Sequence, residues 1–180
     1  MSEDAIEGTD IEFRHSLRRM VALRDCPRIE MAGMTIGPFK AREIFQIEYS
    51  IGRILERKGV ARFDEEILSP DMVFKIHWKE NVQTPERLSS LPKYFYPMLR
   101  RLLAALEEKG SRDPDKLLVY KRLLDFSRDI VNCRLRKVVR LATISAPKQV
   151  LENLTPEERA LYDAICPIVN GWRARILGVI

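Results

Sequence analysis

The chain has 180 residues, of which 46% are hydrophobic and 32% charged, and its formal net charge is +5. This composition is sufficient to bury a core and excludes a disordered polar tail. No apolar run approaches the roughly 18–20 residues that a membrane span requires, and the acidic N-terminal segment argues against a secretory signal or a transit peptide.

The first third of the chain is predicted to be rich in β-structure. Short strand candidates alternate there with turn residues such as the Gly37–Pro38 pair. A helix over residues 50–58 is expected before the last strand, because its apolar residues share a face and Gly59 can take the left-handed conformation that ends a helix. Residues 1–13 hold five acidic and no basic side chains and are expected to form an acidic tail. The predicted strands are Met20–Leu23, Arg28–Met31, Glu43–Ile47 and Val60–Phe63.

Beyond Phe63 the hydrophobic period becomes helical, and the start signals predict four helices. The first begins at Ser69–Pro70, a serine N-cap followed by proline at the first helical position. The last begins at Thr155–Glu158, a capping box with proline in the first turn. Pro167 is expected to kink this last helix. A second helix is predicted after Leu91–Pro92 and ends at Gly110; it starts near Pro97, which falls inside the segment, or bends there. The third and longest helix is predicted from Asp113–Pro114 to about Thr143.

These elements predict an α+β, mainly α fold, in which a small N-terminal β-rich domain is followed by a C-terminal antiparallel helical bundle. The expected boundary lies near residues 64–69. It gives a β-rich domain with its acidic tail over residues 1–66 and a helical domain over residues 67–180. The β-rich part is too small to be stable without docking on another surface.

The motifs that carry common enzymatic chemistry do not occur in the sequence. There is no glycine-rich phosphate-binding loop and no nucleophile elbow. His77 and Glu80 stand one helical turn apart, but a third metal ligand of known spacing is missing, and a partly exposed helix histidine is the favoured interpretation. The carboxylates of residues 64–66 are expected to be solvated. Three dispersed cysteines indicate buried thiols in a reducing compartment rather than a disulfide framework or a zinc site. We therefore expect neither catalysis nor a cofactor.

The segment Asp129–Ala142, DIVNCRLRKVVRLA, mixes apolar and cationic residues in one helix. At about 100° per residue, its apolar side chains cover about half of the circumference, which is more than a surface helix requires. Arg134 falls inside this arc, so we expect it to be buried against a carboxylate or carbonyl partner, because an unpaired buried charge is very costly. Arg136 and Arg140 fall on the opposite face, and Lys137 falls at the margin of the arc.

The division of these cations favours a packing or subunit-interface helix, because a DNA-binding face would gather its cations on one side. A merely solvated role for the exposed arginines remains open. Residues 99–140 hold twelve Lys or Arg and six Asp or Glu, a net of +6, so a nucleic-acid-binding helical module is the alternative hypothesis. The last helix carries an apolar stripe that is typical of a core or of a seam between chains. The stripe consists of Leu161, Ile165, Ile168, Val169, Trp172 and Ile176.

Three segments, in this order and spacing, resemble the helical A domain of the GINS family, the replication-fork complex, and most closely its archaeal subunits. They are LPKYFYPMLRRLL (91–103), RDIVNCRLRKVVRLA (128–142) and NLTPEERALYDAI (153–165). The segment GPFKAREIFQIEYSIGRILERKGVARF (37–63) is similar to the small β-rich B domain of the same family. The resemblance covers roughly residues 20–177 and has the B-then-A domain order.

The resemblance implies a non-enzymatic scaffold without cofactor or metal. Such subunits form tetramers as dimers of dimers with other GINS subunits. The complex bridges the MCM replicative helicase and a RecJ-like partner, can touch polymerase or primase, and contacts DNA weakly or indirectly. A cytoplasmic, nucleoid-associated location in an archaeal cell follows from it. The residues expected at the subunit interface are Arg134, Leu135, Arg136, Lys137, Val138, Arg140, Tyr162, Trp172 and Ile176.

Overall fold

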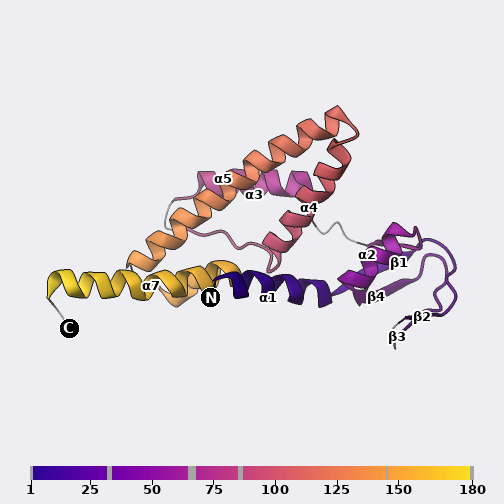
Figure 1. Ribbon diagram of the computed structural model, residues 1–180, viewed down its shortest axis with the longest axis horizontal. Helices are drawn as coiled ribbons and strands as arrows, with labels where there is room; N and C mark the ends of the chain where they lie inside the picture. Colours follow the sequence, from indigo (N-terminus) through magenta and orange to yellow (C-terminus); the bar gives the residue numbers. More distant parts are fainter. Residues whose placement is uncertain (1, 32–33, 65–67, 85–86, 145, 179–180) are drawn as a thin grey trace. The chain divides into compact units, whose positions relative to one another are not determined.

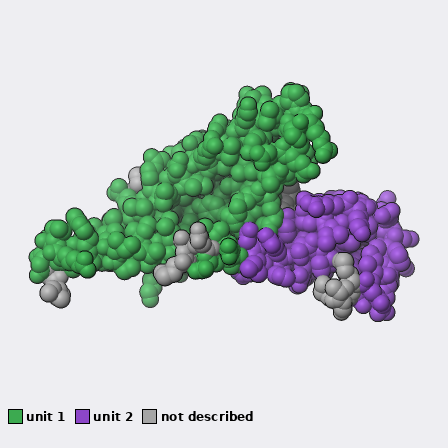
Figure 2. Space-filling view, in the orientation of Figure 1, with its two compact units in different colours: residues 1–9, 68–180 green, residues 10–67 purple. Residues whose placement is uncertain are grey.

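The computed structural model describes residues 2–31, 34–64, 68–84, 87–144 and 146–178 of the chain. It is mainly helical with a few antiparallel strands, which confirms the predicted α+β, mainly α class. The chain divides into two compact units, coloured separately in Figure 2. The β unit comprises residues 10–67, and the helical unit comprises Met1–Thr9 together with Leu68–Ile180.

Figure 1 shows the elements in chain order, and their bounds are as follows. The helices are α1 (Ser2–His15), α2 (Tyr49–Arg57), α3 (Pro70–Val82), α4 (Phe95–Gly110), α5 (Pro114–Ile144), α6 (Lys148–Leu151) and α7 (Pro156–Leu177). The strands are β1 (Leu17–Ala22), β2 (Ile29–Met31), β3 (Met34–Ile36), β4 (Ile44–Glu48) and β5 (Ala61–Phe63).

The acidic N-terminal segment is a helix, α1, and the expectation of a tail there is wrong. Thr9 is buried, and its hydroxyl donates a hydrogen bond to the Ala5 carbonyl at 2.8 Å. Phe13, one turn further on, is fully buried and stacks at a tilt on Tyr49, with 4.4 Å between the ring centroids. The composition obscured this helix, because the segment holds few apolar residues among many acids.

The β unit is built on a three-stranded antiparallel sheet with the order β4-β1-β5. Met20 lies at its centre and is paired with Phe45 of β4 on one side and Phe63 of β5 on the other. The predicted strands are confirmed within one or two residues at most ends, although β1 begins earlier, at Leu17, than expected. Strands β2 and β3 form a separate two-stranded ladder, and β3 was not predicted.

Helix α2 covers the core of the β unit and ends as the sequence predicts. Gly59 follows the C-cap residue with a φ of 63°, the left-handed conformation that glycine adopts without strain. Gly52 lies where the helix passes closest to the sheet. A Cβ at this position would lie 2.7 Å from the Met20 Sδ and 3.1 Å from the Phe63 ring. The close approach of α2 to the sheet therefore requires a residue without a side chain.

Helix α5 is the central element of the helical unit and packs against α3, α4 and α7. Its bounds confirm the prediction of one long uninterrupted helix. The predicted start of α3 is also confirmed, because the Ser69 hydroxyl accepts a hydrogen bond from the Met72 amide at 3.3 Å. Helix α4 begins at Phe95, which places Pro97 in the first turn, where a missing N–H costs little.

Helix α7 starts with the predicted capping box. The Thr155 hydroxyl accepts from the Glu158 amide, and the Glu158 carboxylate accepts from the Thr155 amide at 3.0 Å. The helix continues through Pro167. The short α6, which precedes it, was not predicted. The apolar core of this end of the unit joins α5, α6 and α7 and includes Leu141, Leu151 and Tyr162.

Candidate functional site

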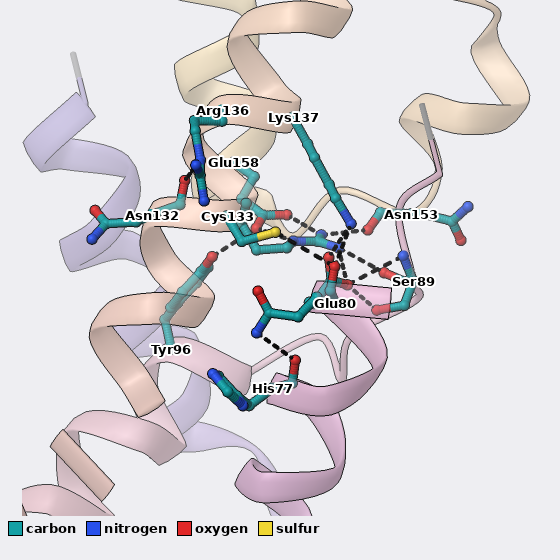
Figure 3. A network of polar contacts seen from close by, with 12 residues as sticks. His77, Glu80, Ser89, Tyr96, Asn132, Cys133, Arg136, Lys137, Asn153 and Glu158 are labelled. Carbon is teal, nitrogen blue, oxygen red and sulfur yellow. Dashed lines mark hydrogen bonds and ion pairs between the residues drawn. The ribbon is translucent and has the colours of Figure 1, made fainter. Parts of the chain in front are cut away.

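Arg134 is the centre of a buried polar network in the helical unit. Figure 3 shows this network, with Glu80, Lys137 and Glu158 among its labelled members. The Arg134 side chain is 1% exposed, and all five of its N–H donors are used. Nε and Nη2 bind the two carboxylate oxygens of Glu158 at 2.8 and 2.6 Å, a bidentate geometry. Nη1 binds Glu80 Oε1 at 3.1 Å and the Ser89 carbonyl at 2.8 Å, and Nη2 also binds the Asn153 carbonyl at 3.1 Å. The prediction that Arg134 is buried against carboxylate and carbonyl partners is confirmed.

Lys137 completes the network one turn further along α5. Its ammonium lies 2.7 Å from Glu80 Oε2 and 3.1 Å from the Glu80 carbonyl oxygen. The Ser89 hydroxyl donates to the other Glu80 oxygen. The lysine is 4% exposed, although it falls at the margin of the apolar arc on a helical wheel. It is buried because α3 packs over that margin and supplies Glu80 as its counter-ion.

Burial and the neighbouring charges act in opposite directions on the pKa values of Glu80 and Arg134. Burial opposes ionisation of Glu80, but hydrogen bonds from Lys137 and Ser89 and the charge of Arg134 outweigh it, so the pKa of Glu80 lies below its ordinary value. Burial also opposes the charge of Arg134, and Glu158 and Glu80 outweigh it and raise the pKa of this guanidinium. Burial raises the pKa of Tyr96, and the neighbouring Glu158 carboxylate raises it further. The phenol therefore stays protonated and donates to Glu158 at 2.6 Å.

This arrangement holds the helical unit together. Two cations of α5 face two carboxylates, one from α3 and one from α7, so the buried charges cancel. Tyr96 adds α4, and the carbonyls of Ser89 and Asn153 add the segments that precede α4 and α7. The network thereby fixes the relative positions of four helices.

The apolar arc of α5 is only half covered by its own chain. Ile130, Val138, Leu141 and Ala142 are buried in the bundle. A line of three residues at helical spacing on the adjoining side remains open to solvent. We call this line the α5 stripe, and its members are Val131 (42% exposed), Leu135 (42%) and Val139 (39%).

The C-terminal half of α7 exposes a second apolar line. In Figure 1 this part of α7, drawn in yellow, runs past the C-terminal end of α5. Arg173 donates a hydrogen bond to the Thr143 carbonyl near the point where the two helices part. We call the exposed line the α7 overhang, and its members are Ile168 (71% exposed), Trp172 (63%) and Ile176 (65%).

A groove with a volume of about 370 Å³ adjoins the α5 stripe. Tyr96 and Arg100 of α4, Val131 and Leu135 of α5, and Leu161 and Glu157 of α7 line it, and its walls are largely apolar. Burial raises the pKa of Glu157 at this wall.

The structure separates the predicted interface residues into two groups. Arg134, Lys137, Val138 and Tyr162 are buried within the chain, so the expectation that their side chains form an intermolecular surface is corrected. They are buried because α3, α4, α6 and α7 pack over them. The others are exposed, and they are Leu135, Arg136, Arg140, Trp172 and Ile176. The Arg136 guanidinium donates to the Asn132 carbonyl within its own helix, at 3.3 Å.

The other residues singled out in the sequence have ordinary structural roles. His77 lies 3.2 Å from Asp129 and packs on the Phe126 ring, and the Glu80 carboxylate is occupied by Arg134 and Lys137. Among the described residues, no group of three or more metal-binding side chains occurs. Cys26 and Cys133 are buried thiols, and Cys166 is partly buried. Residues 65 and 66 of the predicted carboxylate cluster lie outside the described part of the chain.

Sequence reasoning missed the partners of the buried cations. Glu158 was recognised only as the N3 residue of a capping box, and Glu80 only as a candidate metal ligand. The apolar residues around Glu80 and Glu158 could have indicated that both are buried. A carboxylate on the core-facing side of a helix needs a cation, just as Arg134 needs an anion. Ser89 and Tyr96 gave no such signal, because both residue types are common at surfaces.

The comparison with known families agrees with this architecture. The Sld5 family model, described as the GINS complex protein helical bundle domain, matches residues 68–177, which is more than half of the chain and covers α3 to α7. No curated protein matches the sequence. In the described part of the chain, no helix combines the length and apolar character of a membrane span. The chain belongs to the GINS family and is a subunit of a DNA replication complex.

Proposed function

We propose that this chain is a non-enzymatic scaffold subunit that assembles with other GINS subunits into a tetramer through the α5 stripe and the α7 overhang. In that assembly it connects the MCM replicative helicase to a RecJ-like partner in an archaeal cell. Polymerase or primase can join the same complex, and contact with DNA is weak or indirect. The domain division implied by this function is a β-rich B domain over residues 1–66 and a helical A domain over residues 67–180.

The observation that carries the proposal is the exposed apolar surface of two helices. Six large apolar side chains in the α5 stripe and the α7 overhang are 39–71% exposed, and Trp172 is among them. Contiguous exposed apolar patches of this kind on a soluble protein mark interaction sites, and tryptophan is enriched among the residues that dominate binding energy. Arg136 and Arg140 border the α5 stripe as a polar rim.

The alternative, a nucleic-acid-binding module, has less support. Of the four cations in residues 134–140, Arg134 and Lys137 are neutralised by Glu80 and Glu158 and do not face solvent. The other two, Arg136 and Arg140, are exposed, and Asp125 and Asp129 lie about two to four turns before them on the same helix. A phosphate-binding surface would present its cations together.

Sedimentation of the purified chain, alone and co-expressed with a second GINS subunit, tests the proposal. We expect a dimer or tetramer, or a chain that is soluble only with its partner. Leu135→Asp and Trp172→Asp should each weaken assembly at least tenfold, because a carboxylate would be buried without a partner. Leu118→Asp is the matched control, since Leu118 is an exposed leucine of α5 outside both lines. A well-behaved monomer that does not bind any GINS partner would overturn the proposal.

A further inference from the structure

Helix α3 presents a third apolar line that the proposed assembly does not use. Phe74, Trp78 and Val82 follow one another at intervals of four residues and are 52%, 63% and 64% exposed. The opposite side of the helix is buried and carries Val73 and Glu80. We call the exposed line the α3 ridge. Three large apolar side chains in a row on a short surface helix are unusual without a partner.

The base of the ridge is held rigidly against α5. The Phe74 ring meets the Phe126 ring edge-on, with 5.5 Å between centroids, and His77 packs on the same Phe126 ring at 4.7 Å. His77 is also 3.2 Å from Asp129. These contacts fix helix α3 on α5, while Trp78 and Val82 remain exposed to solvent. A preorganised apolar ridge loses little conformational entropy when a partner covers it.

Two lysines flank the ridge on one side. Lys75 lies about 60° from Trp78 around the helix, and Lys79 lies one turn after Lys75. Both side chains are exposed, and neither forms an ion pair with any described residue. In contrast, Lys137, on the buried side of the α3–α5 contact, is fully paired with Glu80. The exposed face of α3 thus combines an apolar line with two lysines that form no ion pair with a described residue.

We propose that the α3 ridge binds an acidic amphipathic helix of a partner protein. The apolar side chains of such a helix, spaced at one turn, would pack against Phe74, Trp78 and Val82. Its Asp or Glu side chains would meet Lys75 and Lys79. This is the mode in which an amphipathic helix lays its apolar face on a complementary surface. The ridge lies on a different helix from the α5 stripe and the α7 overhang, so this function goes beyond subunit assembly.

The composition of the ridge favours a protein partner over single-stranded nucleic acid. Nucleic acid is bound by a continuous cationic track with several aromatic platforms. Here the line ends in the aliphatic Val82, and Asp71 is exposed in the first turn of the same helix. Two lysines on one side of a tryptophan suit the acidic flank of one helix better than a phosphate backbone.

The test uses the full chain and a labelled synthetic peptide of about 18 residues, long enough to form a helix, with leucines on one face and glutamates on the other. We expect saturable binding by fluorescence anisotropy and a blue shift of tryptophan emission. Lys75→Glu with Lys79→Glu should weaken binding at least tenfold. The double variant Lys121→Glu with Lys148→Glu changes the net charge equally at exposed sites elsewhere and should bind as the parent does. Trp78→Phe should keep the binding and lose the blue shift.

Four results would overturn the inference. The first is that the acidic peptide does not bind, and the second is that both double variants bind it with equal affinity. Trp78-dependent binding of a single-stranded oligonucleotide that exceeds peptide binding would identify a nucleic-acid surface instead. A blue shift of Trp78 emission that depends on protein concentration without peptide would identify a second copy of the chain as the occupant. Far-ultraviolet circular dichroism of each variant confirms that the helical unit is folded.

Discussion

Replacement of Arg134 by alanine should destabilise the helical unit far more than replacement of Arg136, although the two residues stand two positions apart on one helix. Arg134→Ala removes five hydrogen bonds and leaves two buried carboxylates with one buried cation, Lys137. The carbonyls of Ser89 and Asn153 also lose their guanidinium donor. Arg136→Ala removes one hydrogen bond at the surface.

The magnitude follows from the burial of the two sites. Removal of one partner from a buried ion pair costs about 3–5 kcal/mol, because the remaining charge is desolvated without compensation. An exposed substitution without special contacts stays within about 0.5 kcal/mol. At roughly 2–4 °C per kcal/mol for a chain of this size, Arg134→Ala should lower the melting temperature by roughly 6–20 °C. Arg136→Ala should lower it by no more than about 2 °C on the same scale.

Thermal unfolding followed by circular dichroism at a fixed protein concentration measures both variants. Arg134→Lys serves as the control for charge, and it should fall between wild type and Arg134→Ala, because a single ammonium cannot bind Glu158 in the bidentate geometry and also reach Glu80. In a double-mutant cycle, Glu158→Ala should cost much less in the Arg134→Ala background than in wild type. Equal melting temperatures for Arg134→Ala and Arg136→Ala would refute the structural role of the network.

Two further predictions concern charge and backbone space. The pKa of Glu80 is lowered on folding, so its contribution to stability is present above the ordinary glutamate value of 4.5 and is lost as the pH falls through the lowered value. When the free energy of unfolding is measured as the pH is lowered, the wild type should lose stability below pH 4.5, and Glu80→Gln should abolish this loss. Glu157→Gln should not lower stability at neutral pH, because burial raises the pKa of Glu157. A loss of stability at neutral pH in Glu157→Gln, together with an unchanged acid-induced loss in Glu80→Gln, would contradict the assignment. Gly52→Ala should destabilise the β unit by about 1–3 kcal/mol, because its Cβ would overlap Met20 and Phe63. Gly171→Ala, in the middle of α7 where a Cβ meets no atom within 4 Å, should stabilise that helix by about 0.5–1 kcal/mol, as denaturant unfolding can measure.

The elements whose ends carry local chemical signals were predictable from the sequence. Ser69–Pro70 and the Thr155 capping box fix the starts of α3 and α7, and Gly59 fixes the end of α2, because these residues satisfy or terminate helical hydrogen bonds with their own neighbours. Helix α5 was predictable from its uninterrupted period. The burial of Arg134 also followed from the helical wheel, since its position lies inside the apolar arc. Helices α1 and α6 and strand β3 lack such signals.

Which charges meet and which apolar faces remain open depends on contacts between segments that lie far apart in the sequence. Lys137 falls at the margin of the arc on a wheel, and it is buried only because α3 brings Glu80 over it from 57 residues away in sequence. The wheel likewise treats Val131 and Val138 as one apolar arc, but the bundle covers Val138 and leaves Val131 exposed. Which side of an apolar helix is covered depends on long-range packing that periodicity does not encode.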